Sequence, residues 1–553
     1  MIGVAMWDSL IPVDPSSAAG YYQRGWWRAE TFLDDLRRAA SQRPDSPAII
    51  AYQNGEHKRT VSYSELTVIT DRFAGALLEL GVTKRDVVVA HLPNWWMLMP
   101  LYLACMRLGA VVAPLIPAMG ERELGYVLRT SGAKVCIVAG QYAGTDYGKR
   151  LLEVAPDSLA HRVVVGDAAA TGAVDFTEFF VRTPWEGRHP VAGLPGPAAD
   201  DVALLVFTSG TTGQPKGVAH TFNTLFAASR TFSDIYQLGT DDVVLIPHFL
   251  AHLAGSAYAI CMSVSIGATC VMQDSMDMNL LLDLVAAHGV TLVFAAPIFV
   301  KGIVAAQRES PRDISTLRCL NSGSAPIPPH LVGAVRNVLG IRLDSNFGMT
   351  ECGAITITRA ADPPGWAARS DGSPVEWTEV RIDAMPGEQV GRLLTRGASQ
   401  CLGYLGQREA YQACLDDDGW FDTGDMARPD GCGGIRITGR RADLIIRSSA
   451  LKVPALEVET VLSEHPAVSE VVLVGYPDPA APEADRVCAV VVPAARPPSL
   501  AELTTYLAGQ QMTDLYWPDR LEVVAELPRN PQGKVLRRRL RDLVSQESTG
   551  PRA

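Results

Sequence analysis

The sequence predicts an α/β protein with a large N-terminal domain of parallel-rich α/β sheets plus a β subdomain, and a small α+β C-terminal domain. Short β-branched runs alternate with helix-length segments through most of the chain, which is typical of parallel strands joined by crossover helices. From 375 to 396 the composition becomes strand-like with turns. At 553 residues the chain is too long for one ordinary core. We therefore predict two domains, 1–441 and 442–553.

Composition limits the classes of protein that fit. Hydrophobic content of 47% and charged content of 20% are typical of globular proteins. A net charge of −11 argues against a nucleic-acid partner, although a local basic pocket remains compatible with it. The 10 cysteines include no C-x-x-C pair, so the sequence indicates neither a zinc site nor a disulfide framework. We expect reduced cysteines in a cytoplasmic protein.

Two apolar stretches invite comparison with membrane spans. The stretch 87–106 contains His91, Pro93 and Asn94, and the stretch 250–272 contains serines and two glycines. Both favour buried strand–turn–helix segments. The opening residues lack the basic start and long apolar run of a signal peptide. We expect no membrane span.

The chain begins with a segment that we expect to be irregular. Its aromatic clusters, Tyr21-Tyr22 and Trp26-Trp27, favour an arm packed onto the body over an exposed partner site. A helix is expected to follow Thr31, whose hydroxyl can cap it.

A hairpin and a capped helix come next. Asn54-Gly55 stands between the β-rich runs 48–52 and 58–61, which predicts a hairpin. Ser62-x-x-Glu65 is a capping box, and apolar residues recur after it at helical spacing. The other strands predicted in this domain are Val87–Ala90, Ala110–Pro114, Val135–Val138, Val163–Val165, Val202–Phe207, Val243–Pro247, Ala268–Met272, Leu292–Ala295 and Ile341–Ser345.

The C-terminal domain is predicted from its own alternation of helices and strands. The expected helices are Val453–Leu462 and Ser499–Gln511, and the expected strands are Val471–Val474, Val487–Val492 and Leu521–Val524. Arginines between 537 and 541 indicate a solvated helix face rather than a nucleic-acid patch.

A loop rich in glycine, hydroxyl groups and one lysine follows the strand Val202–Phe207. The loop, 208–217, has three glycines that bring backbone N–H groups close to a ligand, with four hydroxyls and Lys216 as further donors. It is not a Walker A loop, because Pro215 stands where that motif needs glycine. The pattern favours a phosphate-binding loop over a flexible surface loop.

Two further small-residue segments suit a nucleotide. The turn 321–326 would let a flat ring approach the backbone. In the loop 346–351, Phe347 can stack on a purine and Thr350 can bond a phosphate oxygen. Glu351 can hold Mg²⁺, which prefers oxygen ligands and shared phosphates.

Carboxylate and cationic residues complete the predicted site. Asp425, a carboxylate on a tight turn next to glycine, suits a bidentate grip on two ribose hydroxyls, and Arg440 follows in the segment 439–443. Lys534 comes after a Pro/Gly turn near the end of the chain. The segment 252–258 mixes one imidazole with small and aromatic side chains, so it can line an acyl pocket, or it is a packed helix with a satisfied histidine.

Five separated motifs resemble, in order, those of the adenylate-forming superfamily of acyl-CoA synthetases, aryl-acid ligases, luciferases and peptide-synthetase adenylation domains. They are TSGTTGQPKG, the 321–326 turn, NFGMTE, the segment with Asp425 and Arg440, and the loop ending in Lys534. The resemblance implies a mobile C-terminal domain, and ATP and Mg²⁺ as cofactors. It further implies that a carboxylate attacks the α-phosphorus of ATP to give an acyl-adenylate and pyrophosphate.

The resemblance assigns residues to three roles. The catalytic residues are Lys534, Thr208, Lys216 and Glu351, of which Glu351 is also the metal ligand. The nucleotide-binding residues are Ser209, Gly210, Thr211, Thr212, Gly213, Gly323, Ser324, Ala325, Asn346, Phe347, Gly348, Met349, Thr350, Asp425 and Arg440. The acyl-pocket residues are His252, Gly255, Ser256, Tyr258 and Ser322.

The acceptor of the acyl group stays open at this stage. Coenzyme A is the first expectation, with a medium-chain, cyclic or aromatic carboxylate as the small-molecule substrate. A carrier-protein thiol, an amine, or nitrite activation for diazotisation is the alternative, and a non-catalytic scaffold is the third. Two departures from the family pattern bear on the second half-reaction: Ala442 stands at the hinge, where Asp or Lys is common, and Ala450 stands where glycine is usual.

Overall fold

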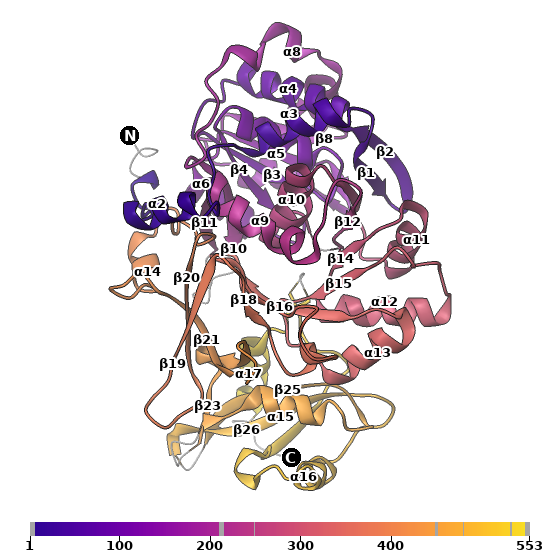
Figure 1. Ribbon diagram of the computed structural model, residues 1–553, viewed down its shortest axis with the longest axis vertical. Coiled ribbons are helices and arrows are strands. Elements are labelled where there is room, and N and C mark those ends of the chain that lie inside the picture. The colour runs from indigo at the N-terminus through magenta and orange to yellow at the C-terminus, as the bar shows by residue number, and fades with distance from the viewer. Residues whose placement is uncertain are drawn as a thin grey trace.

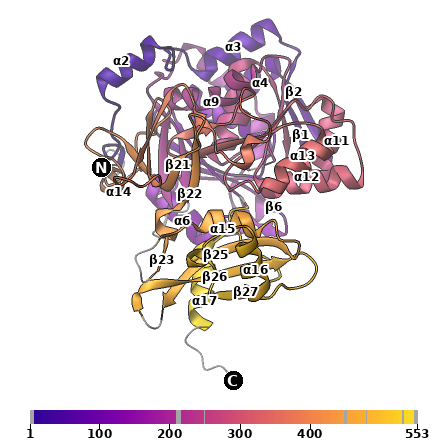
Figure 2. The same ribbon diagram turned by 60° about the horizontal axis from the view of Figure 1, so that its bottom comes forward.

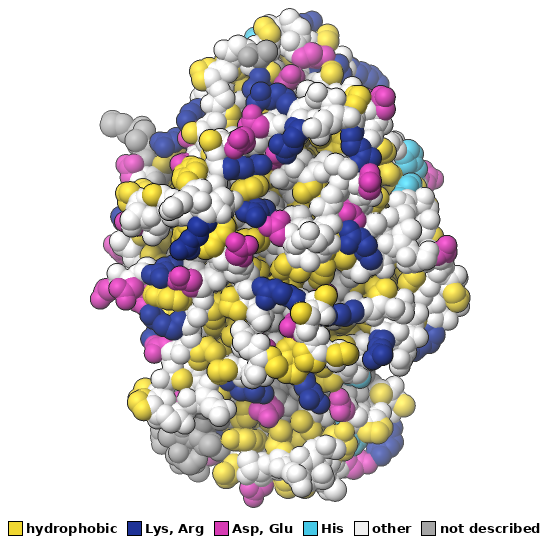
Figure 3. Space-filling view, in the orientation of Figure 1, with side chains coloured by type: hydrophobic (Ala, Val, Ile, Leu, Met, Phe, Trp, Pro, Cys, Tyr) yellow, Lys and Arg dark blue, Asp and Glu magenta, His cyan; other side chains and the backbone are white. Residues whose placement is uncertain are grey.

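The structure, a computed structural model, describes residues 6–208, 215–247, 249–447, 452–478, 481–530 and 533–547. The N-terminal α/β layers occupy the upper part of Figure 1, a four-stranded sheet lies below them, and the C-terminal unit lies at the bottom. On the face in Figure 3, charged side chains of both signs are interspersed. The predicted α/β class is confirmed.

A seven-stranded sheet carries the first run of predicted strands. Its order is β11-β10-β4-β3-β5-β8-β9, with parallel pairing from β10 through β9 and an antiparallel edge strand, β11. Its strands are β3 (Val87–His91), β4 (Val111–Leu115), β5 (Val135–Ala139), β8 (His161–Val165), β9 (Val174–Asp175), β10 (Val202–Thr208) and β11 (Lys216–Thr221). The central strands β3, β4 and β5 are buried at every residue, which is why the sequence shows them as nearly continuous apolar runs.

A nine-stranded sheet holds the other strands predicted in the N-terminal α/β layers, in the order β18-β17-β16-β15-β14-β12-β13-β1-β2. Its strands are β1 (Pro47–Gln53), β2 (Glu56–Ser62), β12 (Val243–Leu245), β13 (Thr269–Gln273), β14 (Leu292–Phe294), β15 (Cys319–Ser322), β16 (Leu343–Met349), β17 (Gly353–Ile357) and β18 (Ser373–Pro374). The hairpin predicted at Asn54-Gly55 is confirmed, because β1 and β2 pair antiparallel and both turn residues have positive φ.

The helices of the N-terminal part cover both sheets. They are α2 (Pro15–Gln23), α3 (Phe32–Gln42), α4 (Tyr63–Glu79), α5 (Leu98–Arg107), α6 (Glu121–Ser131), α7 (Tyr147–Val154), α8 (Trp185–Arg188), α9 (Phe222–Tyr236), α10 (Met262–Ile266), α11 (Met278–His288), α12 (Pro297–Glu309) and α13 (Pro329–Leu339). The predicted capping box is present, since Ser62 N–H donates to Glu65 Oε2 at 2.9 Å and Glu65 N–H donates to Ser62 Oγ at 3.2 Å.

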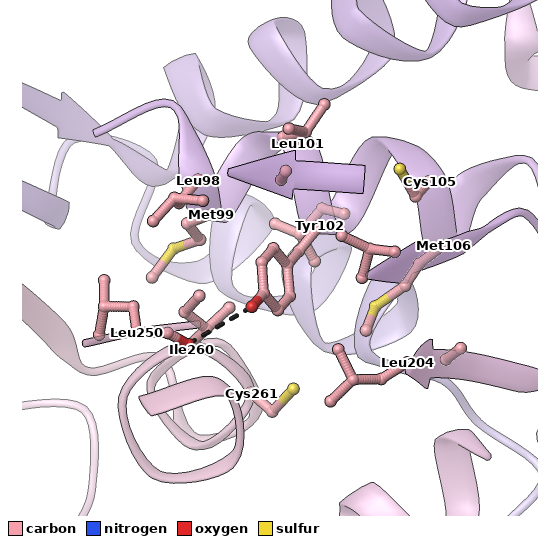
Figure 4. Close-up of a cluster of buried hydrophobic side chains, with 14 of the residues drawn as sticks. Leu98, Met99, Leu101, Tyr102, Cys105, Met106, Leu204, Leu250, Ile260 and Cys261 are labelled. Atoms are coloured by element: carbon pink, nitrogen blue, oxygen red, sulfur yellow. Dashed lines mark hydrogen bonds between the residues drawn. The ribbon is translucent and has the colours of Figure 1, made fainter. Parts of the chain in front are cut away.

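One continuous buried cluster joins the two sheets through α4, α5 and α9. Figure 4 shows part of it, where Tyr102 of α5 reaches the segment around Leu250, with its hydroxyl 3.4 Å from the Leu250 carbonyl oxygen. The apolar stretch 87–106 is therefore a strand, a turn and a buried helix. Of the described helices, none has the length and apolar character needed to cross a membrane.

The predicted β subdomain is an antiparallel sheet in the order β19-β20-β21-β22. Its strands are β19 (Thr378–Asp383), β20 (Gly391–Gly397), β21 (Phe421–Pro429) and β22 (Ile435–Arg440), with α14 (Arg408–Gln412) inserted between β20 and β21.

The C-terminal unit has its own small cores. It contains β23 (Ile445–Ile446), β24 (Lys452–Val453), α15 (Ala455–Leu462), β25 (Val468–Asp478), β26 (Ala481–Pro493), α16 (Leu500–Gly509), β27 (Arg520–Val523) and α17 (Arg537–Glu547). Figure 2 shows this unit beneath the rest of the molecule, with α15 facing upward. The division at residue 442, which falls in a 3₁₀ turn at 441–443, stays a prediction.

Two segments differ from the expectation. The arm contains α2, capped by Asp14, whose side chain accepts from Ser17 N–H at 3.0 Å. The segment 346–349, expected to be a loop, is the end of β16, which forms a hairpin with β17. The predicted packing of the arm is confirmed by Trp27, whose Nε1–H donates to the Ala398 carbonyl at 2.8 Å.

Candidate active site

The strands β10 and β11 hold the mouth of the phosphate loop. Thr208 is the last residue of β10 and pairs with Lys216, the first residue of β11, so the two face each other across the loop. The expected nucleotide-binding residues between them lie outside the described residues: Ser209, Gly210, Thr211, Thr212 and Gly213. The antiparallel pair therefore sets where the loop begins and ends.

Glu351 follows the hairpin strand β16 and is buried, with 8% of its surface exposed. Its Oε1 accepts a hydrogen bond of 2.8 Å from the hydroxyl of Tyr404. The ammonium of Lys216 lies 4.5 Å from the centre of the same tyrosine ring. Burial and the adjacent Glu351 carboxylate raise the pKa of Tyr404, so the phenol stays protonated and acts as a donor.

The backbone beside Glu351 is held by a buried histidine. His220 Nε2 lies 2.7 Å from the Thr350 carbonyl oxygen, and Nδ1 lies 3.1 Å from Thr224 Oγ1. Burial lowers the pKa of His220 to about 4, so its ring is neutral, with Nε2–H as the donor. Sequence reasoning singled out neither His220 nor Tyr404.

The turn after β15 passes very close to β16. A Cβ on Gly323 would lie 2.1 Å from Oδ1 of Asn346 and 2.8 Å from its carbonyl oxygen, so only glycine fits there. Ser324 has a φ of +69°, the left-handed region. The Oγ of Ser322 and the Oδ1 of Asn346 are buried without a hydrogen-bond partner among the described residues. Polar atoms of this kind suit a ligand placed against the turn.

The other predicted residues of this region lie on or beside the same hairpin. Ala325 is half-buried, and Phe347 and Met349 are half-buried on β16. Gly348 approaches β17 so closely that a Cβ would lie 2.4 Å from the Gly353 carbonyl oxygen. Phe347 packs against two buried clusters, one that contains Tyr404 and one that contains Leu393 of the β subdomain.

Asp425 and Arg440 face each other on neighbouring strands. The residues pair in the β21–β22 register, and Arg440 Nε lies 3.1 Å from Asp425 Oδ1. Asp425 Oδ2 is buried and has no hydrogen-bond partner among the described residues. Burial raises the pKa of Asp425, while Arg440 and then Lys534 oppose that shift. This geometry leaves one carboxylate oxygen for hydroxyl donors.

Lys534 reaches the same pair from the C-terminal unit. Its residue surface is exposed. Partial desolvation and next the Arg440 charge lower the pKa of Lys534 to about 8, against the opposing effect of Asp425 and Asp443. The lysine is therefore close enough to Asp425 and Arg440 for their charges to act on it.

The loop that carries Lys534 is fixed at both ends. Lys534 N–H donates to Asn530 Oδ1 at 2.8 Å, and the Lys534 carbonyl accepts from Asn530 N–H at 2.8 Å. Gly533 has a φ of +80°, and a Cβ there would lie 2.7 Å from Cγ2 of Ile298 on α12. The loop thus packs against the N-terminal part through a residue that must be small.

Of the predicted acyl-pocket residues, Gly255, Ser256 and Tyr258 lie in the π-helical segment Gly255–Cys261, with His252 just before it. Ser322 is the last residue of β15. Gly255 lets the segment pass the backbone of Leu250, since a Cβ would lie 2.4 Å from the Leu250 Cα. Burial lowers the pKa of His252 to about 4, so this imidazole is neutral. The Ser256 hydroxyl lies 3.0 Å from that of Tyr102 and 3.1 Å from the Leu250 carbonyl oxygen, so it is buried in the core.

Tyr258 belongs to an aromatic group between α9 and β14. Its ring centre lies 4.6 Å from that of Phe232 and 6.0 Å from that of Phe294. The hydroxyl of the nearby Tyr236 donates to Asp344 Oδ2 at 3.1 Å and accepts from Asn321 Nδ2 at 3.0 Å. The three rings are almost fully buried, and Tyr236, Asn321 and Asp344 form the polar edge of the group.

The donor set fits magnesium better than a caged metal. No group of three or more His, Cys, Asp or Glu side chains suited to a metal exists within the described part of the chain. Mg²⁺ takes one or two carboxylates and completes its shell with water and substrate phosphates. Glu351, which contacts Tyr404 together with Lys216, is a carboxylate of the required kind.

Both parts of the chain match models of a known enzyme family. The family model described as AMP-binding enzyme matches residues 36–405, and the model of the AMP-binding enzyme C-terminal domain matches residues 457–534. The salicyl-AMP ligase / salicyl-S-ArCP synthetase of Mycobacterium tuberculosis is 31% identical, over 96% of this chain and 93% of that protein. The medium-chain fatty-acid–CoA ligase of Escherichia coli is 29% identical, over the same 96% and 93%.

Solved structures show the same architecture. The amide bond synthetase McbA of Marinactinospora thermotolerans superposes with a TM-score of 0.80 at 26% identity. The superposition covers 93% of this chain and 100% of McbA. An anthranilate CoA ligase has a TM-score of 0.82 at 23% identity, covering 94% and 98%. The fold and the matched length define an adenylate-forming acid ligase. The chain belongs to the AMP-binding enzyme family.

Proposed function

We propose that the protein activates a small-molecule carboxylate with ATP and then transfers the acyl group to coenzyme A. In the first step a carboxylate oxygen forms a bond to the α-phosphorus, and the bond from that phosphorus to the leaving pyrophosphate oxygen breaks. The products are an acyl-adenylate and pyrophosphate. In the second step a thiol attacks the acyl carbon and AMP leaves.

The position of Lys534 is the observation that supports this proposal most. A residue of the C-terminal unit lies within electrostatic range of Asp425 and Arg440, which belong to the β subdomain. An ammonium there can meet negative charge that grows on the α-phosphoryl group. Two anions must approach each other in adenylation, so a cation delivered to the ribose side of the site serves the reaction.

The remaining residues would bind and orient the nucleotide. Asp425 would accept from ribose hydroxyls, and Phe347 would contact the purine. Lys216, Thr208 and the loop that they flank would hold the phosphates. Glu351 would hold Mg²⁺, which neutralises phosphate charge when it is bound.

The acid and the acceptor are inferred from the relatives. Relatives over nearly the whole chain are named for fatty acids and for salicylate, and their acceptors include CoA and a carrier protein. The aromatic group around Tyr258 supports a medium-chain, cyclic or aromatic acid. A carrier-protein thiol, an amine or activated nitrite is the alternative, since an amide bond synthetase shares the fold.

One set of incubations tests both steps. The protein is mixed with Mg²⁺, ATP and a panel of fatty and aromatic acids, with CoA, a carrier protein or an amine added in turn, and AMP, ADP and pyrophosphate are measured. We expect AMP and pyrophosphate, with turnover dependent on CoA. Turnover that needs another acceptor supports the alternative, and formation of ADP in place of AMP overturns the proposal.

A further inference from the structure

Tyr404 is a buried residue that contacts both Glu351, the proposed metal ligand, and Lys216, the proposed phosphate contact. Only 2% of its surface is exposed. Its hydroxyl donates to Glu351 Oε1 at 2.8 Å, and its ring face lies 4.5 Å from the Lys216 ammonium. One side chain thus contacts an anionic and a cationic group that the proposed reaction uses together.

The backbone around Tyr404 is bonded to the strand that carries Lys216. Leu405 N–H donates to the Gly217 carbonyl at 2.8 Å, and Leu402 N–H donates to the Ala219 carbonyl at 2.9 Å. Val218 and Tyr404 form an antiparallel bridge. The segment 402–405 is therefore held alongside β11 by an isolated bridge and these hydrogen bonds, which fix the backbone of Tyr404 near Lys216.

The N-terminal strap, residues 6–11, closes the other side of this segment. Ile11 N–H donates to the Leu402 carbonyl at 2.8 Å, and Ser9 Oγ accepts from Gly406 N–H at 2.8 Å. Arg408 donates to the carbonyls of residues 8 and 10 at 3.1 and 3.2 Å. The strap joins a part of the chain almost 400 positions away and holds the backbone on both sides of Tyr404.

We propose that Tyr404 is a positioning residue that fixes the Glu351 carboxylate relative to Lys216, with the N-terminal strap holding Tyr404 in place. The proposal rests on the proposed function, since it assigns Glu351 to Mg²⁺ and Lys216 to phosphate. A carboxylate held by a hydrogen bond loses less freedom when it binds a metal, and groups of this kind matter about 10- to 100-fold in metal affinity.

The test measures nucleotide binding instead of turnover. The dissociation constant for ATP is determined by calorimetry with Mg²⁺ in excess and again with EDTA. Tyr404→Phe keeps the ring and removes the hydroxyl, so we expect the constant with Mg²⁺ to rise about tenfold and the constant with EDTA to stay unchanged. Tyr404→Leu also removes the ring from Lys216, so it should weaken ATP in EDTA by about two- to fivefold.

Tyr411→Phe is the matched control. Tyr411 lies in the same buried cluster, and its hydroxyl donates to the Cys401 carbonyl at 2.9 Å without contacting Glu351. We expect this variant to bind ATP like the wild type under both conditions. Ser9→Ala loosens the strap and leaves Tyr404 intact, so it should raise the dissociation constant for ATP in the presence of Mg²⁺ by about two- to tenfold. This variant replaces Tyr404→Phe as the test if Tyr404→Phe does not fold.

The results separate this inference from the proposed function. If wild-type protein binds MgATP and Tyr404→Phe binds it equally well, the positioning role is overturned and the function stands. Equal losses of MgATP affinity in Tyr404→Phe and Tyr411→Phe indicate general destabilisation and also overturn the role. Wild-type MgATP affinity in Ser9→Ala overturns it as well. If the wild type binds no MgATP, the proposed function itself fails.

Discussion

Arg440 pairs with only one oxygen of Asp425: its Nε lies 3.1 Å from Oδ1, while Oδ2 is buried without a partner among the described residues. A buried carboxylate oxygen left in this state costs free energy unless a ligand satisfies it. Because the two residues are paired across β21 and β22, the backbone keeps Oδ2 in place. A hydroxyl donor, such as that of a ribose, would satisfy this oxygen.

We predict that Asp425→Asn weakens ATP binding by about tenfold or more, the scale of a hydrogen bond to a charged group. The amide carries no charge and accepts more weakly from the ribose hydroxyls. Calorimetric titration with ATP measures the change. Asp383→Asn is the control, because Asp383 is exposed on β19 of the same sheet and pairs with Arg392; it should bind ATP normally. Equal affinity in the wild type and Asp425→Asn would refute the ribose assignment.

Lys534→Ala should lower the rate of adenylation by about 10²-fold or more, the scale for loss of a donor used in the transition state. ATP affinity should change little, since the lysine acts on charge that develops during the reaction. Pyrophosphate exchange measures the rate. Arg538→Ala removes an exposed charge from α17 of the same unit and should leave exchange intact. Wild-type exchange in Lys534→Ala would remove the lysine from the mechanism.

The pH dependence of adenylation follows from the same residue. The lowered pKa of Lys534, about 8, means that the free enzyme holds the ammonium below that pH and loses it above. We expect kcat/KM for ATP to fall as pH rises through about 8, because this quantity reports the free enzyme. Lys534→Arg should abolish the fall, since a guanidinium stays charged. The same fall in the arginine variant would assign the titration to another group.

The strands of the fold were predictable because strands buried on both faces are rich in apolar and β-branched residues. Val87–His91 is buried throughout, and its first three residues are all valine. The end of β16 lacks that composition, because Asn346 and Gly348 are poor strand formers. Their pairing with β17 depends on the tertiary structure. The helix α2 escaped prediction for a similar reason, since none of its residues is buried and no apolar periodicity marks it.

The proposed site was predictable where one short motif carries the chemistry. Glu351, Asp425 and Lys534 each stand in a turn-rich segment with an unusual residue pattern. Tyr404 has no such pattern, and its partner Glu351 is 53 positions away. A hydrogen bond between distant segments is decided by packing, so local spacing could not have pointed to Tyr404.

The last prediction compares Gly323, in the turn after β15, with Gly333 on α13. A Cβ would clash at the first position and would meet open space at the second. A Cβ at Gly323 would overlap the side chain and the carbonyl of Asn346, at 2.1 and 2.8 Å, so Gly323→Ala must displace the turn or β16. We expect the free energy of unfolding to drop by about 1–3 kcal/mol, the range for overpacking, and ATP binding to weaken with it.

Gly333→Ala is the matched control for this substitution. Gly333 is exposed on α13, and a Cβ there meets nothing within 4 Å. Alanine in a helix interior is favoured over glycine by up to about 1 kcal/mol, so this variant should be slightly more stable and bind ATP normally. Urea unfolding and calorimetry measure both quantities. If Gly323→Ala behaves like Gly333→Ala, the close approach of the 323 turn to β16 does not shape the nucleotide site.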